Sequence, residues 1–428
     1  MPDQGGEVPF HPVATLRALE VDGALTVEGG HRVEEVQEHK ATGKRFARLN
    51  KDGLDTWWLI HPGEDGVALE ETQSVVVSPD KTVLTNGLRD GALRQVGNLE
   101  RISAPQGQGV GPFEFLAALT DDGTLVRRWK DATFEANDTS QVKVYYSTVT
   151  RGSDLLRPGQ KFKVQGTALE KLDFVSLMLA LFLGTASLPH ILIRYYTVPS
   201  PAAARKSTIV AIAAIGFFYI LTLFMGLGAM INGVMNPADS NMAAPLLARS
   251  FGGLLFAIIS AIAFATILGT VSGLIVAASG AVAHDLFDRF LNLKMDDRQK
   301  VKAGKISAFV IGAVAILLGI VFKGMNVTFL VGLAFAVAAS ANLPAVLMLL
   351  FWKRTTAKGI VASIAMGVVS SLVLIGLSPE MYHQFGLDVS TAPIPFSNPG
   401  IVSIPLSFIT LVVVSLLTGS KSGVETSG

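Results

Sequence analysis

A cluster of polar and helix-breaking residues lies inside an apolar stretch in the second half of the chain. It runs Gly184-Thr185-Ala-Ser187-Leu-Pro189-His190. Hydroxyl groups and a histidine are costly in hydrocarbon unless they face protein or an aqueous cavity. Proline has no backbone N–H and clashes with the carbonyl four residues earlier, so we expect an interrupted helix here. Such breaks form solute and ion sites in secondary transporters, and the alternative is a proline kink without a site.

A second group of small and hydroxylated residues follows at helical spacing. It runs Thr266-Ile-Leu-Gly269-Thr270-Val-Ser272-Gly273. Small residues allow helices to pack closely in membranes, which is one interpretation. Hydroxyl and carbonyl oxygens also suit a hard cation such as sodium. The spacing alone does not decide between packing and ion binding.

A third group contains an amide and a second proline. It runs Ala338-Ala-Ser340-Ala-Asn342-Leu-Pro344. The proline predicts a second break in the middle of a membrane helix. Asn342 would then either line a pathway or bond a carbonyl that the break frees.

Seven stretches have the length and apolar character of membrane spans. A span needs about 20 mostly apolar residues, and half of the 428 residues are apolar while only 16% are charged. The third stretch is longer than the hydrocarbon is thick, so it must tilt, break or extend beyond the membrane. We expect an all-α polytopic membrane domain over residues 174–420, with spans near 174–196, 208–234, 252–284, 304–323, 327–352, 359–378 and 400–419.

Basic residues predict the side of the membrane on which each loop lies. The loops after the first, third and fifth stretches are rich in lysine and arginine, which is typical of cytoplasmic loops. Residues 235–250 and 379–399 carry few basic residues and are predicted to lie outside. The domain before the first span is then also outside, and residues 421–428 form a cytoplasmic tail. We expect a multi-pass protein of a bacterial inner membrane.

The first 173 residues have the pattern of a soluble domain. Apolar and polar residues alternate in short runs such as Thr56–Ile60, which predicts strands. Asp121-Asp-Gly predicts a hairpin that joins Phe113–Leu116 to Leu125–Trp129. We therefore expect a mostly β extracytoplasmic domain over residues 1–173.

The charges and residue types of this domain exclude two classes of function. It carries 20 lysines and arginines against 26 acidic residues, whereas the rest of the chain carries 15 against 8. An acidic head argues against nucleic acid as a partner. The chain has no cysteine, and we find no catalytic constellation in the head and no paired ionisable groups in the spans. We expect that the protein is not an enzyme.

Three ordered motifs resemble the sodium:solute symporter family, and within it the cation/acetate symporters. They are Gly184–Val198, Ala263–Leu274 with Ala283–Leu286, and Ala339–Arg354. The resemblance covers about residues 168–420. It implies a leucine-transporter-like core of two inverted five-helix repeats, of which this chain would contain the second. The first span would be the broken helix that opens this repeat.

The resemblance also implies roles for individual residues. The solute site would include Gly184, Thr185, Ser187, Pro189, His190 and Asn342. The coupling sodium ion would be held in the third span by the carbonyl of Thr266 and the hydroxyl of Thr270. Many relatives have two adjacent hydroxyls at this point. Here Gly269 precedes Thr270, so one of the ion's ligands is absent.

The helices of the first repeat have no counterpart in residues 1–428. Nor does the N-terminal sequence have a signal-peptide pattern. We expect this chain to be an incomplete, C-terminal part of a transporter, with the first-repeat helices on an upstream polypeptide and residues 1–173 in the loop between the repeats. The predicted function is sodium-coupled symport of a small organic acid, an acetate-like monocarboxylate, across the lipid bilayer. The alternative is a non-transporting membrane sensor with a ligand-binding β head.

Overall fold

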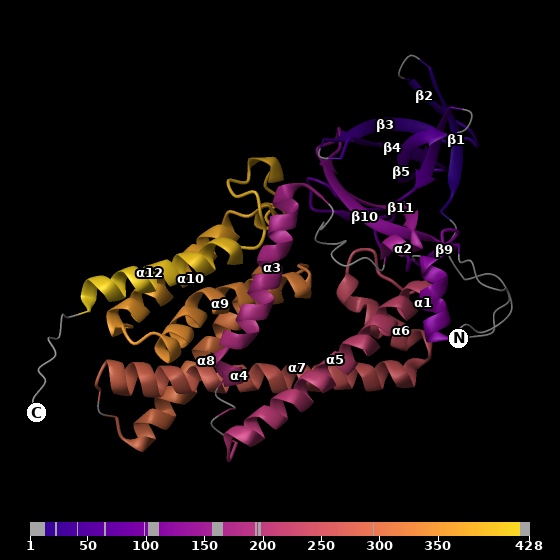
Figure 1. The fold of residues 1–428 in the computed structure, drawn as a ribbon. Coiled ribbons are helices and arrows are strands. Elements are labelled where there is room, and N and C mark those ends of the chain that lie inside the picture. The colour runs from indigo at the N-terminus through magenta and orange to yellow at the C-terminus, as the bar shows by residue number, and fades with distance from the viewer. Residues whose placement is uncertain are drawn as a thin grey trace, which may run out of the picture. The chain divides into compact units, whose positions relative to one another are not determined.

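The structure of the chain is a computed structural model, shown in Figure 1. It describes residues 13–21, 24–40, 42–63, 66–97, 99–101, 111–155, 166–192, 195, 198–293 and 295–419. The predicted cytoplasmic tail, residues 421–428, lies outside this part of the chain. Contacts divide the chain into two compact units, Met1–Arg157 with Gly216–Ala261 and Pro158–Ile215 with Ile262–Gly428.

The described strands form two antiparallel sheets, both in the first unit. One has the order β2-β1-β6-β5-β4-β3 and the other β8-β7-β11-β10-β9. The first sheet consists of β1 (Thr15–Val21), β2 (Ala24–Val27), β3 (Arg32–His39), β4 (Lys44–Lys51), β5 (Leu54–Gly63) and β6 (Gly66–Glu71). The second consists of β7 (Gln73–Val77), β8 (Val83–Thr85), β9 (Leu99–Arg101), β10 (Leu125–Glu135) and β11 (Gln141–Arg151). The predicted β-rich region ahead of the spans is therefore confirmed.

Two adjacent tryptophans of β5 show how the strand alternation builds the core. Successive side chains of a strand point to opposite faces. Trp57 packs with Phe46 and Tyr146 in a core shared by the two sheets. Trp58 packs with Leu69 on the other face of the first sheet. The outer strands β2 and β3 contact each other, so this sheet curls around the second core.

The predicted hairpin at Asp121-Asp-Gly is wrong in its first arm. Pro112–Thr120 forms a helix, α1, and only the second arm is a strand, β10. Pro112 occupies the first helical position, where a missing N–H has no consequence. The Glu114 side chain accepts from the backbone N–H of Gly111, which closes the first turn. Phe115 and Leu119, four residues apart, share one buried face. Burial of this face stabilises a helix over Pro112–Thr120 in place of the strand predicted there.

Three short helices complete the first unit together with the C-terminal part of α5 (Pro201–Ile231). They are α2 (Gly152–Leu155), the 3-10 helix η2 (Ser240–Met242) and α6 (Ala243–Ser250). Leu227 and Met230 of α5 pack against Phe115 and Leu119 of α1. The end of this long apolar helix therefore shares a hydrophobic core with the β-rich region.

Six described helical segments are long and apolar enough to cross a membrane. They are α5, Gly253–Asp288, α8 (Asp297–Val321), α9 (Val327–Phe351), α10 (Ala357–Gly376) and α12 (Gly400–Thr418). The segment Gly253–Asp288 consists of α7 (Gly253–Gly280) and most of the π-helix η3 (Ala281–Phe290). It is the longest of the six, as expected from the uncharged third stretch. Shorter elements, α11 (Pro379–Gln384) and the 3-10 helix η4 (Val389–Thr391), join α10 to α12.

The first predicted span corresponds to two helices, α3 (Ala168–Ser187) and α4 (Pro189–Leu192). Its first turns contain Glu170, Lys171 and Asp173, so α3 is not among the six segments of membrane character. The seventh span therefore stays a prediction.

Four helices of the second unit, α3, α9, α10 and α12, pack together (Figure 1). In the most apolar part of α9, 44% of the residues are buried, whereas none are buried in the corresponding parts of α5 and α7. Helix α9 is therefore the centre of the packing.

The predicted second break, at Pro344, is wrong. Helix α9 is continuous from Val327 to Phe351 with Pro344 buried inside it. The proline leaves the carbonyl of Ser340 without its usual helical donor. Gly367 of α10 lies directly against that carbonyl. Close packing by a neighbouring helix accommodates a buried proline without ending the helix.

Candidate functional site

The interruption predicted in the first span is present. Helix α3 ends at Ser187, because Leu188 adopts an extended conformation with φ −69° and ψ 118°. Helix α4 begins at the next residue, Pro189. Proline is well suited to a first helical position because no intrahelical bond is needed from its nitrogen. The chain therefore ends one helix and begins another within the polar cluster.

The break brings together two residues that the sequence predicts as site residues. The side-chain nitrogen of Asn342, on α9, donates to the backbone carbonyl of Ser187 at 3.3 Å. That carbonyl belongs to the last residue of α3 and lacks an intrahelical donor. The bonded carbonyl belongs to the break between α3 and α4 and not to Pro344, so the predicted role of Asn342 stays a prediction. The amide is half-buried, so the contact lies inside the helix packing.

Gly184 positions this contact by allowing α3 to approach α9. A Cβ atom at Gly184 would lie 2.5 Å from the carbonyl oxygen of Phe335 and 2.7 Å from its Cβ. These separations are too short for any side chain, so only glycine fits. Gly184 is therefore a packing residue of the α3–α9 interface, close to the break.

The hydroxyls of the cluster are held by their own helix. Thr185 donates to the carbonyl of Leu181 at 2.7 Å and is exposed, whereas Ser187 donates to the carbonyl of Gly184 at 3.1 Å and is fully buried. Hydroxyls that bond backwards to the preceding turn can exchange this bond for a ligand. Pro189 is exposed and His190 is partly exposed. In this cluster the hydroxyl of Thr185 and the ring of Pro189 are exposed, the ring of His190 is partly exposed, and Ser187 is buried.

The residues predicted to bind sodium lie on α7. Thr266 donates to the carbonyl of Ile262 at 2.8 Å, and Thr270 donates to the carbonyl of Thr266 at 3.0 Å. Both threonines and Gly269 are exposed, and no atom lies within 4 Å of the Cβ position at Gly269. The carbonyl of Thr266 and the hydroxyl of Thr270 are thus adjacent. Among the described residues, no hydrogen bond joins these two oxygens to the α3 cluster.

A seam of buried serines, which the sequence analysis missed, joins α12 to its neighbours. Ser403 bonds Ser340 of α9 at 2.7 Å, and Ser407 bonds Ser363 of α10 at 2.9 Å. All four are fully buried. The spacing of four residues between Ser403 and Ser407 could have indicated this seam, because it places both on one face of a helix.

A carboxylate at the start of α3 also escaped the sequence analysis. Asp173 accepts from the backbone nitrogen of Asn398 at 2.8 Å and from its side-chain nitrogen at 3.1 Å. Burial raises the pKa of the Asp173 carboxyl, against the opposing effect of hydrogen bonds from Asn398 and Ser397. Ser176, one turn later, donates to the carbonyl of Asn398 at 2.6 Å. The start of α3 is therefore tied to the segment that leads into α12.

Comparison with known proteins identifies the family. The sodium:solute symporter family matches residues 134–367, more than half of the chain. The chain belongs to the sodium:solute symporter family. This family consists of transporters and not of enzymes. Its members are membrane proteins, and the six segments of membrane character agree with a multi-pass bacterial membrane protein.

Two curated relatives show how much of a family member is present. The uncharacterized symporter YwcA of Bacillus subtilis is 45% identical over 280 residues, which cover 63% of this chain and 53% of the relative. A monocarboxylic acid transporter of Corynebacterium glutamicum is 44% identical over 313 residues, which cover 70% of this chain and 56% of the relative. The chain thus spans about half the length of the curated relatives it matches. No solved structure matches this symporter chain.

Proposed function

We propose that this chain provides the second repeat of a sodium-coupled symporter for a small monocarboxylate. The observation that carries the proposal is the break between α3 and α4, with the freed carbonyl of Ser187 bonded to Asn342. In transporters of inverted-repeat fold, the substrate binds where broken helices expose backbone groups near the middle of the membrane. A family member with such a break in the corresponding helix has half of a solute site.

The chemistry of the break suits a small organic acid. The hydroxyls of Thr185 and Ser187 are donors, and the side chain of His190 adds a ring nitrogen. Donors of this kind bind a carboxylate. The name of the Corynebacterium relative, a monocarboxylic acid transporter, supports the same class of solute.

Sodium is the proposed coupling ion, at the carbonyl of Thr266 and the hydroxyl of Thr270. The hydroxyl now donates to that carbonyl at 3.0 Å. A cation between the two oxygens would replace this bond, with the hydroxyl turned so that its lone pair faces the ion. Gly269 contributes no side-chain oxygen, so the remaining ligands would come from other helices.

The exposure of α7 supports the proposal that another region of the transporter covers this helix. Threonine and serine hydroxyls on a membrane helix can bond a neighbouring helix, and among the described residues the hydroxyls of α7 bond only carbonyls of α7 itself. Thr266, Thr270 and Ser272 are all exposed along α7. We propose that the helices of the first repeat cover this face and supply the other half of the solute and sodium sites. Transport would then belong to the chain together with that region.

Uptake into proteoliposomes tests the proposal. Vesicles would contain this chain together with the additional region found in its relatives, and labelled propionate uptake would be measured with an inward sodium gradient, an inward potassium gradient or none. We expect uptake above the empty-vesicle background only with sodium, and less with an Asn342→Ala variant. Equal uptake under all three gradients would contradict sodium coupling. Binding of propionate without uptake would favour the sensor.

A further inference from the structure

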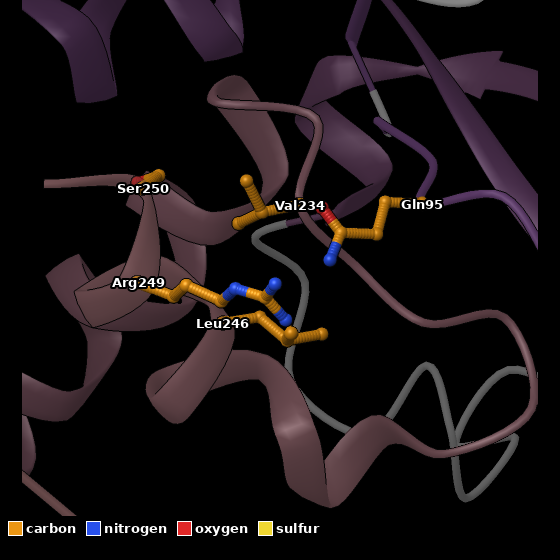
Figure 2. A pocket seen from close by; sticks show the side chains of 5 residues that line it. All are labelled: Gln95, Val234, Leu246, Arg249 and Ser250. Atoms are coloured by element: carbon orange, nitrogen blue, oxygen red, sulfur yellow. The ribbon is translucent and has the colours of Figure 1, made fainter. Parts of the chain in front are cut away.

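A hollow of about 320 Å³ lies in the β-rich unit, outside the proposed transport site. The described residues that line it are Gln95, Val234, Leu246, Arg249 and Ser250. Figure 2 shows the guanidinium of Arg249 and the amide of Gln95 extending into the space between their elements. Among the described residues, the lining contains one cation, one amide, one hydroxyl, two aliphatic side chains and no carboxylate. It is therefore positive and partly apolar.

Backbone bonds hold the two sides of the hollow together. Val96 donates to the carbonyl of Met235 at 2.8 Å, and Met235 donates to the carbonyl of Val96 at 3.0 Å. Gln95 precedes Val96 and Val234 precedes Met235 in the chain. This reciprocal pair fixes the two lining residues next to each other. The hollow is therefore a built feature of the fold.

The end of α5 forms the apolar wall. Gly233 has a φ of +62°, and the N–H groups of Gly233 and Val234 donate to the carbonyls of Met230 and Ala229. This is the Schellman arrangement, in which a left-handed glycine ends a helix and the next residue packs back onto it. Val234 accordingly packs against Ala229 and Leu246. Both aliphatic lining residues are buried.

Arg249 supplies an exposed cation that no described carboxylate pairs with. It lies in the last turn of α6 and forms no ion pair or side-chain hydrogen bond with any other described residue. Arg94, next to Gln95 in the chain, is instead paired with Glu71. An arginine in a hollow without acidic residues raises the local concentration of anions.

We propose that this hollow binds a short-chain monocarboxylate. A guanidinium presents parallel N–H groups that match the two oxygens of a carboxylate. The amide of Gln95 can donate a further bond, and Val234 and Leu246 can contact a short alkyl chain. A single cation with aliphatic walls suits a carboxylate with a hydrocarbon tail better than a phosphate, which needs more donors. The loop that contains Arg249 is predicted to lie outside, on the side from which a solute enters.

A local reporter can detect this binding independently of transport. The chain has no cysteine, so Ser250→Cys labelled with a trifluoromethyl group places one fluorine probe at the rim. Ala117→Cys, on the exposed side of α1, is the matched control. The full chain in lipid nanodiscs would be titrated with sodium propionate, sodium chloride, sodium phosphate or uncharged propionamide, and fluorine NMR would record the shift.

We expect a saturable shift at position 250 with propionate only, and none at position 117. Arg249→Gln should weaken propionate binding at least tenfold, Arg249→Lys should weaken it less, and Lys323→Gln, a matched loss of charge elsewhere, should leave it unchanged. Equal shifts with chloride, phosphate or propionamide, or an unchanged affinity in Arg249→Gln, would overturn the proposal. Uptake is measured separately, so a failure of transport leaves this result interpretable.

Discussion

Asp173 and Asn398 lie 225 residues apart in the chain and form a two-point contact. One carboxylate oxygen of Asp173 accepts both the backbone and the side-chain nitrogen of Asn398, at 2.8 and 3.1 Å. Asn398 is almost completely buried. No charged or histidine side chain occurs on α9 or α12, the long helices packed against α3, and Glu170 and Lys171 are its charged neighbours on α3 itself. The contact therefore ties α3 to α12 in largely uncharged surroundings.

This contact predicts a pH dependence of stability. Burial raises the pKa of the Asp173 carboxyl, so the folded chain holds this proton to a higher pH than the unfolded chain does. Its contribution to stability is complete below the unfolded pKa, about 3.9, and is lost as pH rises through the folded pKa. Asp173→Asn keeps an acceptor but does not titrate. Between pH 4 and 7, we expect the thermal midpoint in detergent to fall more in the parent than in this variant. Parallel pH profiles would refute this.

The α3–α9 contact predicts that Gly184 tolerates no side chain. Gly184→Ala would force its methyl into the backbone of Phe335, and overpacking of this kind costs about 1–3 kcal/mol. Gly319→Ala, on α8, is the control because, apart from the backbone of its own helix, no atom lies within 4 Å of its Cβ position. Thermal unfolding of both variants in the same detergent would test the prediction. A midpoint for Gly184→Ala equal to that of the control would contradict it.

The bond from Asn342 to Ser187 predicts a loss of stability when the amide is removed. Asn342→Leu leaves the freed carbonyl without a donor, and an unsatisfied buried group costs about 1–3 kcal/mol. Thr185→Val is the control, because that hydroxyl is exposed and bonds only to its own helix. Denaturant unfolding should show a lower midpoint for Asn342→Leu than for Thr185→Val. The reverse order would show that the amide bond is dispensable.

The sequence predicted features that depend on local chemistry. The break at Pro189 follows from the missing N–H of one proline, and the strands of the head follow from the alternation of apolar and polar residues. Pro344 shows the limit of this reasoning. The same residue type lies inside a continuous helix there, because Gly367 of a neighbouring helix packs against the carbonyl of Ser340. Whether a proline ends a helix thus depends on contacts distant in sequence.

Other features of the structure could not be read from the sequence for the same reason. Asn398 gives no local indication of its contact with Asp173, since the two meet only after α3 and α12 pack. The segment Pro112–Thr120 has a turn signal after it and apolar residues at helical spacing within it. It forms a helix because Phe115 and Leu119 are buried on one face. Nor does the sequence indicate the bond from Asn342 to Ser187, because 155 residues separate the two.

The central claim, that α7 contributes to the site of a coupling sodium ion, is tested most directly by the sodium dependence of uptake in Thr270 variants. The measurement is labelled propionate uptake as a function of sodium concentration, in proteoliposomes that contain the chain with the additional region of its relatives. Thr270→Ala removes one of the two proposed oxygens, so we expect the half-saturating sodium concentration to rise about tenfold, equivalent to about 1.4 kcal/mol. Thr270→Ser keeps the oxygen and should raise it less. An unchanged sodium dependence in correctly inserted Thr270→Ala would contradict the claim.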